Sequence, residues 1–148
     1  MNIDVLKKIV NNLCLETLEM NGGHILSCHD TTDDVLIYRL KNENKYASSA
    51  WDIPRKRILT LIQKGILAYG EKVIKWMNAT SYQGDIILKL NCKDVIGHGY
   101  TKAKWHNWED GAWTTTSYIV VLRKVYTNSN YDTFTVASAY PFKPNPTI

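Results

Sequence analysis

Apolar residues recur at helical spacing through the first part of the chain. Over residues 1–20 they approximate one face of a helix, so we expect an N-terminal helix there. The pair Gly22-Gly23 would end this helix. The run Thr31-Thr32-Asp33-Asp34 is typical of a helix start and predicts a short second helix that carries Arg39.

A third helix is predicted from Pro54 to about Tyr69, with another turn or two after Gly70. Beyond residue 79 the pattern changes to the β-branched and alternating segments typical of strands, at residues 85–91, 117–125 and 132–140. Asn128-Ser129-Asn130 would form a hairpin loop between the last two. Helices first and adjacent strands later favour an α+β domain with an antiparallel sheet.

Composition narrows the class of protein without naming a function. The 148 residues fit one domain, with the N-terminal helix at 1–20 and the remainder at 21–148. A net charge of +4 permits binding to a polyanion without demanding it. The three cysteines include no C-x-x-C pair, so neither a disulfide framework nor a metal site is predicted. No apolar run approaches the ~20 residues of a membrane span, and the N-terminus lacks a signal-peptide pattern.

Aromatic residues alternate with lysines in a loop-like stretch between residues 97 and 116. Aromatic rings can stack on RNA bases while lysines contact phosphates. An alternative is that the tryptophans anchor the core or an interface. We favour this structural role for Trp113, and for Trp105 and Trp108 we weigh it equally with base stacking. The candidate substrate-binding residues are Lys102, Lys104, Trp105 and Trp108.

The strongest chemical signal is a set of polar residues divided between the two ends of the chain. It consists of His24, His29, Arg39, Ser138 and Tyr140. Histidine transfers protons near neutral pH, and arginine stabilises a phosphorane. Serine and tyrosine can donate hydrogen bonds to the same oxygens. These are the groups that RNA cleavage without a metal or other cofactor requires, although each histidine taken alone is more often structural.

Strand geometry refines this hypothesis. Residues two apart in a strand point the same way, so Phe134, Val136, Ser138 and Tyr140 are expected on one face. A structural role for Ser138 and Tyr140 at a strand end is the alternative that spacing alone favours. His24 and His29 lack the spacing of a zinc pair, and a Cys28–His29 nucleophile pair is disfavoured because sequence neighbours usually point apart.

A series of short motifs follows in order from about Asn21 to Pro141. It comprises Gly22-Gly23-His24 to His29, Leu36-x-x-Arg39-Leu40, residues 46–51, Ile74-Lys75-Trp76, residues 96–99, Val120-Val121-Leu122 and Ser138-Ala139-Tyr140-Pro141. Each motif is weak alone. Their order and spacing together resemble the bacterial ribonuclease A-like toxin domain, found at the C-terminus of contact-dependent growth inhibition effectors and related polymorphic toxins.

The resemblance implies a pancreatic-ribonuclease-like fold without disulfides, in which N-terminal helices pack on a bent antiparallel sheet. It also implies that His29 and Arg39 are catalytic, that the family's Thr-x-Tyr-Pro end falls on Ser138 and Tyr140, and that His24 matches a second histidine. Two departures stand out. Serine replaces the usual threonine at position 138, and the spacing from His29 to Arg39 is one residue shorter than usual.

We therefore expect a metal-independent ribonuclease toxin that forms a 2′,3′-cyclic phosphate. His29 would be the general base or the general acid, and His24, Tyr140 or water would transfer the second proton. The resemblance implies delivery as part of a larger effector, action on RNA in the target-cell cytoplasm, and an immunity protein, expected to be acidic, that blocks the site. The rival interpretations are a non-catalytic RNA-binding module and, disfavoured by a pI near 8.9, an immunity protein.

Overall fold

The structure, a computed structural model, describes residues 1–26, 28–43, 45, 47–80, 84–101, 112–127 and 130–144. Within them the helices are α1 (Ile3–Asn11), α2 (Leu15–Met20), α3 (Asp33–Asn42), α4 (Arg55–Ala68) and α5 (Gly70–Asn78). The strands are β1 (Ala47–Trp51), β2 (Ile86–Asn91), β3 (Gly97–Thr101), β4 (Ala112–Thr115), β5 (Ser117–Thr127) and β6 (Asn130–Pro141). The α+β class predicted from the sequence is confirmed.

The N-terminal stretch forms two helices where one was expected. The Asn2 side chain caps α1 by accepting a hydrogen bond from the Val5 amide at 3.0 Å. Helix α1 ends at Asn11, and α2 begins at Leu15. The apolar pattern carries a trace of this break, because Leu13 and Leu15 are two positions apart, a spacing that one helix face does not accommodate.

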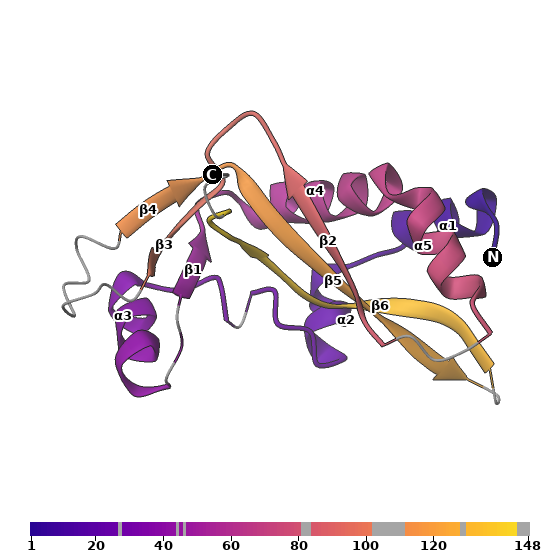
Figure 1. Cartoon of the computed structure of the whole chain (residues 1–148), viewed down its shortest axis with the longest axis horizontal. Helices are drawn as coiled ribbons and strands as arrows, with labels where there is room; N and C mark the ends of the chain where they lie inside the picture. Colours follow the sequence, from indigo (N-terminus) through magenta and orange to yellow (C-terminus); the bar gives the residue numbers. More distant parts are fainter. Residues whose placement is uncertain are drawn as a thin grey trace.

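The strands form two antiparallel sheets of three, in the orders β2-β5-β6 and β1-β3-β4. The first holds the three predicted strands; residues 128–129 of the expected hairpin loop lie outside the described residues. The second was missed, and β3 and β4 occupy the ends of the stretch expected to be a loop. In Figure 1 this second sheet and α3 lie at one end of the molecule, away from α1 and α5.

The composition of β1 and β3 explains why the second sheet escaped prediction. Both strands are built largely from small or polar residues, and Thr101 is their single β-branched side chain. The glycines of β3 are required for its close approach to β1. A Cβ on Gly99 would lie 2.3 Å from the Ser48 carbonyl oxygen, and one on Gly97 would lie 2.7 Å from the Ala50 carbonyl oxygen.

The main core lies between the β2-β5-β6 sheet and helices α1, α4 and α5, which pack on one another and on the sheet. Leu6, Ile62, Ile66, Leu88 and Leu122 are fully buried there. None of the three cysteines forms a disulfide, as expected. Among the described residues, no helix is both long and apolar enough to cross a membrane.

A bulge in β6 changes the direction of the side chains in the C-terminal half of this strand from the one expected. Val136 pairs with Leu122 but Ser138 pairs with Val121, so Ala137 is an extra residue. Phe134 and Val136 are buried, and Ser138 and Tyr140 are only partly buried. The prediction that these four side chains share one face is therefore wrong. The bulge turns Ser138 and Tyr140 to the face opposite Phe134 and Val136.

Candidate functional site

The segment that carries both N-terminal histidines is fastened against β6. The His24 amide donates to the Ala137 carbonyl at 2.9 Å, beside the bulge. Gly23 fits here because a Cβ would lie 2.7 Å from the Leu18 carbonyl oxygen and 2.9 Å from that of Val136. Ile25, the next residue, is fully buried in the core. The Glu19 carboxylate accepts from the Ile25 amide at 2.8 Å, so backbone contacts, one carboxylate and one apolar anchor together position the segment.

His29 lies between β1 and β6. Its Nδ1 is 2.9 Å from the Ser49 carbonyl oxygen, and its own carbonyl accepts from the Trp51 amide at 2.8 Å. Its ring stacks on that of Tyr140, with centroids 5.0 Å apart and planes at 22°. The structure thus brings together a histidine from the start of the chain and a tyrosine from its end.

These contacts define the protonation state of His29. A carbonyl only accepts, so Nδ1 carries the proton and the neutral ring has its lone pair on Nε2. Burial lowers the pKa of His29 to about 4, against the opposing effect of the Ser49 carbonyl, and the nearby Arg39 and Lys45 charges lower it further. At neutral pH the ring is therefore a base with one defined acceptor nitrogen.

Arg39 joins this group from α3. Its guanidinium donates a hydrogen bond to the carbonyl oxygen of Cys28, the residue before His29. The shorter spacing between His29 and Arg39 therefore does not separate them. A cation beside a neutral base is an arrangement suited to an anionic transition state.

Ser138 and His24 form a second pair at the margin of the site. The Ser138 hydroxyl donates to the His24 carbonyl at 3.2 Å, so its proton is engaged with backbone. The His24 side chain is exposed, and its Nδ1 lies 3.5 Å from the Cys28 sulfur. Burial raises the pKa of Tyr140, which keeps its phenol protonated and able to donate.

The structure also places residues that sequence reasoning did not assign to the site. Ser49 holds His29 through a backbone carbonyl, which no side-chain pattern could reveal. Lys45 adds positive charge near His29. The predicted substrate-binding residues Lys102, Lys104, Trp105 and Trp108 lie outside the described residues. Trp113, favoured as an anchor, donates from its indole to the Thr101 hydroxyl at 2.9 Å.

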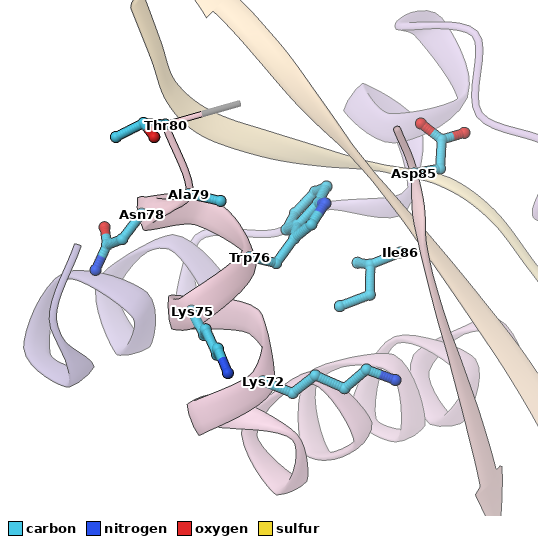
Figure 2. A pocket seen from close by; sticks show the side chains of 8 residues that line it. All are labelled: Lys72, Lys75, Trp76, Asn78, Ala79, Thr80, Asp85 and Ile86. Atoms are coloured by element: carbon cyan, nitrogen blue, oxygen red, sulfur yellow. The ribbon is translucent and has the colours of Figure 1, made fainter. Parts of the chain in front are cut away.

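A separate hollow of about 680 Å³ lies between α5 and the start of β2. Figure 2 shows Trp76 and Ile86 pointing toward it, with Lys72 and Lys75 at its rim. None of the described residues that line it is a histidine or a cysteine. Figure 1 places α5 at the opposite end of the molecule from α3. Among the described residues, no group of histidine, cysteine and carboxylate side chains has an arrangement that could hold a metal ion.

Comparison with known proteins yields a likeness in fold. No family model matches the sequence, and no curated protein matches it. One chain in the crystal structure of a CdiA-CT/CdiI complex from Y. kristensenii 33638 superposes with a TM-score of 0.63 at 14% identity. The match covers 81% of this chain and 95% of that chain. At this identity the likeness shows a shared α+β fold, and function has to be argued from the site.

Proposed function

We propose that this protein is a metal-independent ribonuclease toxin of the contact-dependent growth inhibition type. One observation carries the proposal: His29 is a neutral base with a lone pair on Nε2, held by the Ser49 carbonyl and stacked on Tyr140. Arg39 lies beside it and supplies a fixed positive charge. A base and a cation at one place are what an attack by a ribose 2′-hydroxyl requires.

The reaction would begin at Nε2 of His29, which takes the proton of the 2′-hydroxyl. The 2′-oxygen then bonds to the adjacent phosphorus and forms a phosphorane. Arg39 stabilises its added negative charge, and the protonated phenol of Tyr140 donates to one of its oxygens. The bond to the 5′-oxygen breaks, and that oxygen takes a proton from His24 or water. The products are a 2′,3′-cyclic phosphate and a 5′-hydroxyl.

The structure favours base over acid for His29. A general acid must be protonated before the reaction, whereas a pKa of about 4 leaves this ring neutral at pH 7. Ser138 contributes less directly than the sequence suggested. Its hydroxyl proton is directed to the His24 carbonyl, so its support for the phosphorane requires a rotation or acts through the placement of His24.

The toxin assignment is supported by the fold shared with a chain of a CdiA-CT/CdiI complex. That complex contains both a toxin domain and its immunity protein, so the likeness alone is compatible with either role. The net charge of +4 and the group formed by His29, Arg39 and Tyr140 favour the toxin. The protein would then be delivered within a larger effector, act in the target-cell cytoplasm and be neutralised by an acidic immunity protein.

The deciding experiment uses the purified protein with total RNA and with DNA of matched length, both in EDTA. RNA should be cut to fragments that end in 2′,3′-cyclic phosphate, and DNA should survive because it lacks the 2′-hydroxyl. His29→Ala should be inactive. Asp94→Asn, which removes an exposed partner of Arg57, should remain active as a matched surface control.

Four outcomes would count against the proposal. Activity that disappears in EDTA and returns with magnesium would exclude the mechanism. RNA binding without cleavage would support the non-catalytic module. Absence of both, with tight binding to a separate nuclease, would support the immunity role. Expression in bacteria without a partner and without a growth defect would exclude the toxin.

A further inference from the structure

A second histidine, His98 on β3, is held between two carboxylates. Its Nε2 lies 2.6 Å from an Asp33 oxygen, and its Nδ1 lies 2.7 Å from an Asp52 oxygen. Asp33 is in the first turn of α3, and Asp52 directly follows β1. Three elements therefore meet at one ring. We call His98, Asp33 and Asp52 the His98 clamp.

The hydrogen bonds of the His98 clamp define its charge. Ionised carboxylates only accept, so both ring nitrogens must donate, and only the imidazolium form has two N–H groups. The two aspartates lie against different nitrogens of one ring. They therefore do not converge with it on a single point, which separates the clamp from a metal site.

The clamp joins the two elements that position the proposed catalytic group. Helix α3 packs on β1 and β3, and it carries Arg39 less than two turns after Asp33. Strand β1 holds His29 through the Ser49 carbonyl and the Trp51 amide. Asp52 follows Trp51 directly. By bridging Asp33 and Asp52, His98 thus ties the support of Arg39 to the support of His29.

We propose that His98, held between Asp33 and Asp52, is a positioning residue that keeps Arg39 aligned with His29. The inference rests on the proposed function, since it concerns the placement of that same catalytic group. His98 itself does not reach the reacting atoms in this scheme, because both of its nitrogens are occupied. Its effect is transmitted through α3 and β1.

The clamp is sensitive to pH. The titratable groups that face His98 are Asp33 from α3, Asp52 after β1 and Tyr100 from β3, whose ring meets it edge-on at 6.5 Å. Burial opposes the charged ring, but the two carboxylates outweigh it and raise the pKa of His98. When the ring loses its proton, one nitrogen presents a lone pair to a carboxylate. The hydrogen bond on that side of the His98 clamp is then lost.

The test uses His98→Gln, which retains a polar side chain but cannot donate from both ends, and Asp33→Asn, a milder change at an exposed position. Asp94→Asn is the matched control, because it also removes an exposed carboxylate from an ion pair. The first readout is amide hydrogen exchange across α3, which needs no catalytic activity. The second is kcat and KM for RNA cleavage as a function of pH.

Both clamp variants should exchange α3 amides faster and lose about 10-fold in kcat with little change in KM, because Arg39 acts in the transition state. The wild type should fall toward their level as pH rises through the pKa of His98, and the control should match the wild type. Unchanged exchange, or unchanged kcat in an active enzyme, overturns the inference. If the wild type cleaves no RNA, the proposed function fails, and with it the catalytic part of the inference. The amide hydrogen-exchange measurement then tests only whether the His98 clamp stabilises α3.

Discussion

His29 and His98 both lie against strand β1, but the first ring is neutral and the second is cationic. Burial and the nearby charge of Arg39 keep His29 neutral, and the backbone carbonyl of Ser49 defines which ring nitrogen carries the proton. The carboxylates of Asp33 and Asp52 keep His98 charged. The same side chain is a base in one place and a cationic crosslink in the other. Residue type therefore defines what chemistry is available, and the partners of each ring decide which chemistry is used.

The two regions also differ in how they are supported. His29 is held by backbone groups and by the stacked ring of Tyr140, so its orientation does not depend on a charge. The His98 clamp depends on charged side chains that are partly exposed to solvent. We therefore expect changes at His29 to affect chemistry strongly, and changes at His98 to act through alignment and with greater sensitivity to pH.

The largest expected effect follows from His29→Ala. Loss of the general base should reduce kcat/KM for RNA by about 10³-fold or more. Stability should fall by about 1 kcal/mol, because one hydrogen bond and one ring contact are lost. Kinetics and denaturant unfolding measured on the same preparation check both numbers.

His24→Ala is the matched variant, since His24 is exposed and is the candidate donor of the proton to the leaving 5′-oxygen. It should reduce activity by less than His29→Ala does. If His24→Ala is the more damaging change while His29→Ala mainly lowers stability, the proposed roles of the two histidines are reversed.

Arg39→Lys preserves the positive charge at this position and removes the guanidinium. A lysine cannot donate in parallel to a phosphorane, nor reproduce the bond to the Cys28 carbonyl in the same geometry. We expect kcat to fall by about 10²-fold with KM within a few-fold of wild type. Full activity in Arg39→Lys would show that charge alone is sufficient at this position.

Part of the fold and of the candidate site could be predicted from the sequence, and the rest could not. The acidic turn at Thr32-Asp33-Asp34 located α3 and so placed Arg39 on a helix, and Gly70 marked the boundary of α5. Alternation along 85–91 located β2. These features could be predicted because each depends on residues that are close together in the sequence.

The remainder depends on contacts between distant segments. Nothing in the order of residues 134–140 reveals that Ala137 is a bulge, because the bulge exists only relative to the partner strand β5. The carbonyl of Ser49 has no side-chain signal. His98 stood in a glycine-rich stretch whose pairing with β1 could not be inferred without knowing that β1 is a strand.

The pH dependence of RNA cleavage tests whether the neutral ring of His29 is the base. If His29 is the base, kcat/KM should fall on the acid side near pH 4, the pKa of the folded ring. At pH 5 a ring titrating at 6.5 would leave the enzyme about 30-fold less active than one titrating at 4. An acid limb near 6.5 would mean that a different histidine supplies the base.

Tyr140→Phe separates the stacked ring from its hydroxyl. The ring contact with His29 is retained, so stability and the pKa of His29 should change little. Loss of one donor to the phosphorane should reduce kcat by about 10-fold. Tyr140→Ala removes both functions and serves as the comparison. Equal effects from the two variants would assign the contribution of Tyr140 to its hydroxyl alone.

The smallest expected effects concern stability as a function of pH, where the two histidines act in opposite directions. The pKa of His29 is about 4 when folded and 6.5 when unfolded, so the unfolded chain binds the extra proton. Folding stability from this group rises with pH between those values and is constant above them. The pKa of His98 is raised on folding, so its contribution is complete below 6.5 and is lost as pH rises through the folded value.

His29→Gln should therefore flatten the acid side of a plot of unfolding free energy against pH. His98→Gln should flatten the neutral-to-alkaline side and leave the acid side unchanged. Denaturant unfolding at half-unit steps from pH 4 to 9 measures both curves. If both variants flatten the same side, the two rings do not differ in protonation state as the contrast between a neutral His29 and a cationic His98 requires.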